Sequence, residues 1–163
     1  MEVIIFIGIQ ASGKSAFHHR YFRDSHVRVN LDMLRTRRRE SLLFNACLEG
    51  ETRCVIDNTN VSRKSRERYI LPARERDFPV MGYYFASGAA ECLRRNAERR
   101  GTARIPDKGL LATYNRLEIP ASEEGFDQLF YVRVASSSGN SSNSSCARDG
   151  EHEFLIEDWK NEV

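Results

Sequence analysis

Apolar residues are concentrated in short segments along the chain, and each segment is followed by a longer and more polar stretch. The first segment, Val3 to Ile7, is rich in β-branched residues and is followed by glycine, which is typical of a buried parallel strand. The pattern predicts strands over 3–7, 26–29, 54–56, 80–85 and 129–134. It predicts helices over 14–23, from Asn30 or Asp32 to 48, and over 62–76, 89–100 and 108–117. Strands that alternate with helices predict an α/β fold with a parallel central sheet flanked by helices on both faces.

The C-terminal part departs from this alternation. Residues 136–145 are nearly all Ser, Asn and Gly, and such a segment cannot bury apolar area. We therefore predict a flexible Ser-rich loop over about 136–150. Residues 153–159 are apolar enough to return as a short strand or anchor. The tract is interpreted as an insertion in a loop, and residues 1–163 as a single domain.

The composition is 40% apolar and 29% charged, which is ordinary for a soluble globular protein. The apolar start of the chain is too short for a signal peptide, and no run approaches the length of a membrane span. We therefore expect a cytoplasmic protein with no membrane partner. The 4 cysteines form no CxxC pair and show no disulfide-like spacing, so we expect reduced thiols.

Positive charge is concentrated in the first part of the chain. Residues 1–104 carry 20 Lys and Arg against 12 Asp and Glu, whereas residues 105–163 carry 5 against 11. Most of these cations are arginines, which bind phosphate in a bidentate manner, so a polyanionic substrate fits the distribution. A solvated charged surface fits it as well. Three consecutive arginines, 37–39, span most of a helical turn and are interpreted as part of such a surface.

The segment from Gly8 to Ser15 matches the phosphate-binding pattern G-x-x-x-x-G-K-[ST]. It begins directly after a predicted strand and opens a predicted helix, which is the arrangement that this loop requires. We expect Gly8, Ser12 and Gly13 to form a cradle of backbone N–H groups for the phosphates of ATP. Lys14 is expected to reach the β- and γ-phosphates and Ser15 to hold Mg²⁺ through its hydroxyl.

Two acidic residues follow the second and third predicted strands. Asp32 is a candidate general base for a hydroxyl, and Arg35, three residues later on the same predicted helix, is a candidate ligand for an acceptor phosphate. An N-cap with an exposed ion pair is the alternative for this pair. Asp57 lies at the carboxyl end of a buried strand, where open α/β sheets bind ligands, and is expected to hold Mg²⁺. An Asx turn is the alternative for Asp57.

A basic segment at 95–107 is predicted to form a small lid. Arg95 and Arg99 are four residues apart on one helix face, and Gly101 and Pro106 bracket a mobile segment. Such a lid can close over ATP and bring guanidinium groups to the γ-phosphate. We expect Arg95 to contribute to ATP binding and Arg99 or Arg100 to act in catalysis. Favourable placement of cations at a helix C-terminus is the alternative.

Together these segments resemble the kinase domain of the phage and mammalian polynucleotide 5′-hydroxyl kinases. The shared motifs, in order, are GxxxxGKS at 8–15, N-x-D-x-x-R at 30–35, D-N-T-N at 57–60 and R-N-x-x-x-R-G-T-x-x-x-P at 95–106. The resemblance extends over about residues 3–134 and includes Glu124-Gly125-Phe126-Asp127. It is strongest to small stand-alone bacterial kinases of this group, and it implies a P-loop kinase fold with the first strand in the middle of the sheet.

The resemblance also implies roles for individual residues. Lys14 and Ser15 match the ATP and Mg²⁺ ligands of the family, Asp32 its general base and Asp57 its strand-end acid. Arg35 matches the residue that contacts the acceptor phosphate, and the lid arginine falls on Arg99 or Arg100, depending on where the alignment is anchored. The D-x-D-G-T signature of the phage enzyme's 3′-phosphatase is absent, and Gln10-Ala11 replaces Pro-Gly in the loop.

Three functions remain open on the sequence. The first is an ATP- and Mg²⁺-dependent kinase whose acceptor is the 5′-hydroxyl of a nucleic acid. The second is a kinase of a small metabolite or nucleoside on the same scaffold. The third is an ATP-binding regulatory module without phosphotransfer, against which Asp32 argues, because pure binding has little need of an acceptor-side base. The sequence does not define the oligomeric state.

Overall fold

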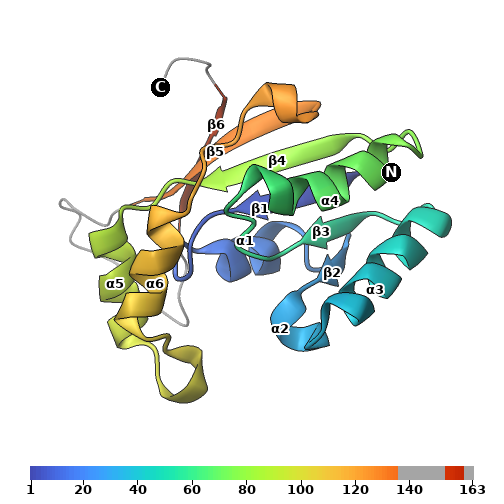
Figure 1. Ribbon diagram of the computed structural model, residues 1–163. Helices are drawn as coiled ribbons and strands as arrows, with labels where there is room; N and C mark the ends of the chain where they lie inside the picture. Colours follow the sequence, from blue (N-terminus) through green and yellow to red (C-terminus); the bar gives the residue numbers. More distant parts are fainter. Residues whose placement is uncertain (136–152, 160–163) are drawn as a thin grey trace, which may run out of the picture.

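A computed structural model describes residues 1–135 and 153–159 of the protein. Its strands form one sheet in the order β2-β3-β1-β4-β5-β6, with helices on both faces (Figure 1). The strands are β1 (Val3–Ile7), β2 (Val27–Val29), β3 (Cys54–Ile56), β4 (Val80–Phe85), β5 (Gln128–Val134) and β6 (Phe154–Asp158). The α-helices are α1 (Lys14–Tyr21), α2 (Leu31–Leu34), α3 (Arg37–Glu49), α4 (Arg63–Arg74), α5 (Ala89–Glu98) and α6 (Asp107–Asn115). Two short 3₁₀ helices are η1 (Gly101–Ala103) and η2 (Ser122–Glu124).

The sheet is parallel except for one edge strand. Strands β1 to β5 pair in parallel, and β6 runs antiparallel to β5, with Val134 opposite Phe154. The expected α/β fold with a central sheet and β1 inside it is therefore confirmed, and 153–159 does return as a strand. The Ser-rich tract expected to be a flexible loop, 136–150, lies outside the described residues. Because the parallel strands share one direction, the loops that follow β1, β2 and β3 meet at a single edge.

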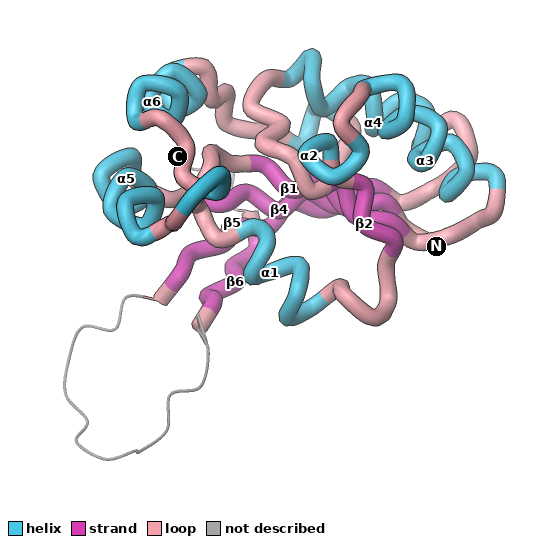
Figure 2. Tube along the Cα trace, turned by 90° about the horizontal axis from the view of Figure 1, so that it is seen from below, coloured by secondary structure: helices cyan, strands magenta, loops and turns pink. Residues whose placement is uncertain are grey.

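Successive residues of β1 point to opposite faces of the sheet and enter two separate apolar clusters. Ile5 and Ile7 pack with Phe44 of α3 and Tyr69 of α4 on one face. On the opposite face Phe6 packs against Phe17 of α1, with their ring centroids 5.7 Å apart. Figure 2 shows α1 on one side of the sheet and α3 and α4 on the other. Burial on both faces explains why β1 is a continuous apolar run rather than an alternating one.

The helix expected from Asn30 or Asp32 to 48 is two helices. Asn30 caps α2 by accepting a hydrogen bond from the N–H of Met33, and α2 ends after Leu34. Arg35 adopts a left-handed conformation with φ of 69°, and Thr36 then caps α3. The single-helix expectation was wrong because Thr36 is itself a helix-starting residue, which the three arginines that follow it obscured. Similarly, α5 ends at Glu98, two residues before the expected end, and Arg99 is extended.

The acidic motif before β5 joins α4 to the sheet. The side chain of Arg66 is fully buried and donates two hydrogen bonds of 2.6 Å to the carboxylate of Glu124. Asp127 accepts a hydrogen bond of 2.7 Å from the N–H of Val80 at the start of β4. Glu124 and Asp127 thus hold the chain between α6 and β5 against its neighbours, away from the phosphate-binding loop.

Within residues 1–135 and 153–159, Cys47, Cys54 and Cys92 are buried free thiols, as expected, and Cys146 lies outside these ranges. No helix in the same ranges combines the length and apolar character needed to cross a membrane.

Candidate active site

The phosphate-binding loop joins β1 to α1 and depends on two glycines with positive φ. Gly8 has φ of 153°, and a Cβ there would lie 3.0 Å from the Cβ of Phe85. Gly13 has φ of 101°, and a Cβ there would lie 3.1 Å from Cγ2 of Val134. Since neither position tolerates a side chain easily, the two glycines let the backbone turn back at the N-terminus of α1. The N–H groups and the dipole at this helix end form a cradle suited to phosphate.

The side chain of Lys14 is held inside the loop by hydrogen bonds to other loop residues. Its side chain is buried, and its Nζ donates to the carbonyl oxygens of Gly8 and Ile9 at 2.9 and 2.6 Å and to Oγ of Ser12 at 3.3 Å. Burial lowers the pKa of Lys14 to about 8, an effect that Asp57 partly offsets and Arg99 reinforces. The ammonium group is therefore held inside the loop at the place where anionic phosphates would replace the carbonyl oxygens as its partners.

Ser15 and Asp57, the two expected metal ligands, face the same point. The guanidinium group of Arg28 donates from Nη2 to Oγ of Ser15 at 3.2 Å and from Nε to Oδ2 of Asp57 at 2.8 Å. A hydroxyl and a carboxylate that converge on one cation are a donor set that fits Mg²⁺. Within the described ranges no group of three or more His, Cys, Asp or Glu side chains could hold a metal. With Ser15 and Asp57 as its two ligands from the protein, Mg²⁺ would take its other ligands from nucleotide phosphates and water.

Asp32 lies on the first turn after β2, across the cavity from the lid. It is exposed on α2. The start of α2 is attached to Asn58, whose Oδ1 accepts a hydrogen bond from the N–H of Leu31 at 2.9 Å. Asn30 reinforces this attachment by donating to the backbone oxygen of Asp57. Arg35 does not share a helix face with Asp32, contrary to expectation, because the chain turns at Arg35.

The segment predicted to form a lid, 95–107, is held by a buried asparagine. Asn96 on α5 donates to the carbonyl of Ile105 at 2.7 Å and accepts from the N–H of the same residue at 3.1 Å. Arg95 donates to the carbonyl of Ala11 at 3.2 Å, which ties α5 to the phosphate-binding loop. Arg95 and Arg99 line the cavity beside this loop, and Arg100 is not among the lining residues. Of the two arginines between which the sequence left the choice open, Arg99 is therefore the one beside the phosphate-binding loop, and its role in catalysis stays a prediction.

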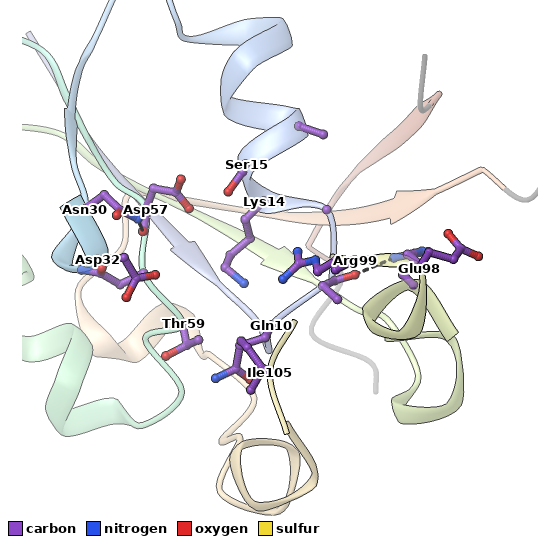
Figure 3. A pocket seen from close by; sticks show the side chains of 15 residues that line it. Gln10, Lys14, Ser15, Asn30, Asp32, Asp57, Thr59, Glu98, Arg99 and Ile105 are labelled. Carbon is purple, nitrogen blue, oxygen red and sulfur yellow. Dashed lines mark hydrogen bonds between the residues drawn. The ribbon is translucent and has the colours of Figure 1, made fainter. Parts of the chain in front are cut away.

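These elements enclose a cavity of about 380 Å³. In Figure 3, Lys14 lies between Asp32 and Asp57 on one side and Arg99 on the other. A second cavity of about 460 Å³ adjoins the first and shares Asn58 and Thr59 with it. The second cavity is lined by residues of α3, of the start of α4 and of the end of α6. Its charged side chains are Arg37, Arg116 and Glu118, and Arg37 is ion-paired with Glu40 of α3.

The sequence did not point to Arg28 as a site-building residue, and it indicated Asn58 only as a side chain able to hydrogen-bond nearby loops or phosphates. Arg28 stands between two valines in a short strand, and the signal was a charged residue in an otherwise apolar strand. Its register opposite Val55 of β3 brings it beside Asp57, which only the sheet order reveals. Asn58 donates to the buried carboxylate of Glu40 at 2.6 Å, so a contact from α3, distant in sequence, determines its orientation.

The fold and this cavity define the class of the protein. A phosphate-binding loop between a central parallel strand and a helix, beside a basic segment, describes a P-loop, kinase-like domain. The chain belongs to the AAA_33 family of AAA domains, whose model matches residues 3–120.

One relative is a bifunctional polynucleotide phosphatase/kinase from Schizosaccharomyces pombe, 28% identical over 129 residues. The match covers 77% of this chain but only 32% of that protein, so the chain spans about a third of the relative's length.

Solved structures with the same fold include kinases of small molecules. Kti12 from Chaetomium thermophilum in complex with ADP-AlF3 matches with a TM-score of 0.61 at 15% identity, over 80% of this chain and 88% of that one. A gluconokinase from Sinorhizobium meliloti 1021 matches with a TM-score of 0.57 at 17% identity, over 83% of both chains. A sugar kinase from Janibacter sp. HTCC2649 matches with a TM-score of 0.56 at 16% identity, over 80% and 85%. At these identities the likeness concerns the fold alone.

Proposed function

We propose that the protein transfers the γ-phosphoryl group of ATP, with Mg²⁺, to the 5′-hydroxyl of a polynucleotide. The observation that carries phosphotransfer is the carboxylate of Asp32, which lines the same cavity as Lys14 and Arg99. A site that only binds nucleotide needs the cradle and the metal ligands. A carboxylate on the opposite wall is what a hydroxyl acceptor requires for orientation and for removal of its proton.

The reaction divides among residues of this chain. Backbone N–H groups from Gly8 to Ser15 and the ammonium of Lys14 bind the phosphates, and Ser15 and Asp57 hold the metal. When bound, Mg²⁺ neutralises charge on the β- and γ-phosphates. Asp32 accepts the proton of the acceptor hydroxyl. The guanidinium of Arg99 neutralises charge on the transferring group.

The second cavity supports a long acceptor. It adjoins the first at Asn58 and Thr59, and its two arginines, Arg37 and Arg116, are exposed. A nucleic acid whose 5′ end lies beside Asp32 would place a following phosphate within the second cavity, near Arg37 and Arg116. Arg35, the residue expected to contact that phosphate, is exposed and lines neither cavity. Its role in substrate binding stays a prediction.

A small-molecule acceptor is the second candidate, and the gluconokinase and sugar kinase among the structural neighbours favour it. The two candidates differ in whether the second cavity is used. A small acceptor is satisfied by the cavity beside Asp32, whereas a polynucleotide extends beyond it.

The test is transfer of label from γ-labelled ATP with Mg²⁺ to a panel of acceptors: 5′-hydroxyl oligonucleotides, nucleosides and gluconate. The proposal predicts label on oligonucleotides, an apparent KM that falls as the oligonucleotide lengthens, and loss of that length dependence in Arg37→Gln/Arg116→Gln. Label on nucleosides or gluconate alone would establish the second candidate. ATP hydrolysis without labelling of any acceptor would reject both candidates.

A further inference from the structure

Arg28 contacts both of the side chains that the proposed function assigns to the metal. It extends from β2 and donates from Nε and Nη2 to Oδ2 of Asp57, at 2.8 and 2.5 Å, and from Nη2 to Oγ of Ser15 at 3.2 Å. We propose that Arg28 is a resident cation of the metal position, which must leave Asp57 before a divalent ion can reach both ligands. The inference rests on the proposed function, since it assumes that Ser15 and Asp57 bind the metal.

The two partners of this ion pair differ in their freedom to move. The side chain of Asp57 is 2% exposed, and its backbone N–H and carbonyl are bound to Val29 and Asn30, so its carboxylate is fixed. The side chain of Arg28 is 30% exposed, so its guanidinium group can turn toward solvent. Arg28 can therefore be displaced, whereas Asp57 cannot follow it.

The other basic side chains near Asp57 either donate to different partners or are less readily charged. Lys14 donates to the carbonyl oxygens of its own loop. Burial, and then the charge of Arg28, lowers the pKa of His18, which disfavours the charged form of this imidazole. Among the described residues, the hydrogen bonds to the Asp57 carboxylate come from Arg28. Without Arg28, and without a metal, the buried carboxylate would lose these hydrogen bonds and keep only the more distant charge of Lys14, which is costly for the folded state.

The arrangement makes metal binding a competition. A divalent ion gains the Asp57 and Ser15 oxygens only at the cost of the charge-assisted hydrogen bonds from Arg28. The dissociation constant of the metal is therefore raised, and removal of Arg28 lowers it while destabilising the metal-free protein. If Arg28 merely supported the fold, its removal would destabilise the protein without tightening metal binding.

The test uses Mn²⁺, whose binding to the protein with saturating ADP is followed by electron paramagnetic resonance. Arg28→Gln is expected to lower the Mn²⁺ dissociation constant about tenfold, the equivalent of one charge-assisted hydrogen bond. Arg28→Lys, which keeps the charge but lacks the forked geometry, is expected to fall between Gln and wild type. The melting temperature of metal-free Arg28→Gln should lie several degrees below wild type, and Mn²⁺ with ADP should close most of that gap.

Arg23→Gln is the matched control, because Arg23 is an exposed arginine whose partners are His19 and Asp24 rather than the metal ligands. It should leave the Mn²⁺ dissociation constant unchanged. In an Asp57→Asn background, Arg28→Gln should no longer tighten Mn²⁺ binding, because the competition requires the carboxylate. Unchanged or weaker Mn²⁺ binding in Arg28→Gln would overturn the inference and leave the proposed function standing. Failure of Mn²⁺ to bind any of these proteins with ADP would overturn both.

Discussion

Nucleotide affinity should fall steeply above pH 8, because Lys14 loses its proton in the free protein. Burial lowers the pKa of Lys14 to about 8, from an ordinary value of 10.5. Phosphates stabilise the charged ammonium, so the pKa rises again when nucleotide binds, and binding above pH 8 takes up a proton. A base with a lowered pKa in the free state binds an anion fully below that pKa and progressively more weakly above it.

The magnitude follows from the protonated fraction. With a pKa of about 8, roughly nine tenths of Lys14 is charged at pH 7 and about one tenth at pH 9. The affinity for ADP should therefore fall about tenfold, or about 1.4 kcal/mol, between pH 7 and pH 9. Titration calorimetry in two buffers of different ionisation enthalpy measures both the affinity and the proton uptake, which should approach one proton at pH 9.

Lys14→Met is the control for this prediction, because it keeps the length of the side chain and removes the proton. Its ADP affinity should be weaker at pH 7 and nearly independent of pH from 7 to 9. A wild-type affinity that does not change over this interval would refute the reasoning. The same slope in Lys14→Met would assign the proton to another group and refute it equally.

Three further changes test how the fold supports the site. Asn96→Ala removes the side chain that binds both the carbonyl and the N–H of Ile105 in the proposed lid. The value of kcat should fall about ten- to hundredfold, with a smaller change in ADP affinity. An unchanged kcat would contradict a role for the lid. Arg66→Met leaves the carboxylate of Glu124 buried and unpaired, so the free energy of unfolding in urea should fall by about 3–5 kcal/mol; a loss below about 1 kcal/mol would show that the pair is dispensable. Gly13→Ala forces a side chain into φ of 101° and should cost about 1–3 kcal/mol and weaken ADP binding, whereas Gly88→Ala, with nothing within 4 Å of its new Cβ, should stay within about 0.5 kcal/mol.

Much of the fold could be predicted because its signals are local. The apolar run from Val3 to Ile7 and the glycines after it determine a buried strand and a tight loop without help from distant residues. The break at Arg35 could not be predicted in this way. Thr36 can continue a helix as well as cap one, and the three arginines after it give no apolar period that decides between the two.

The candidate site divides along the same line. Four of the candidate residues follow the ends of strands: Lys14, Ser15, Asp32 and Asp57. Parallel strands bring such residues to one edge of the sheet, so their proximity could be predicted from the order of the elements. The pairing of Asp57 with Arg28 depends on the order in which β2 and β3 lie side by side. The sequence alone does not show that Arg28 and Asp57 are partners. They are separated by the connection that contains α2 and α3, and no regular spacing links them.

The most direct test of the account is the effect of Asp32→Asn on single-turnover transfer from γ-labelled ATP to a 5′-hydroxyl oligonucleotide. The substitution keeps the size of the side chain and removes its ability to accept a proton. The account predicts that the rate of transfer falls by about 10²–10⁴-fold, while the affinity for ADP with Mg²⁺ remains close to that of wild type. Transfer at the wild-type rate in Asp32→Asn would contradict the claim that this cavity carries out acceptor-side base catalysis.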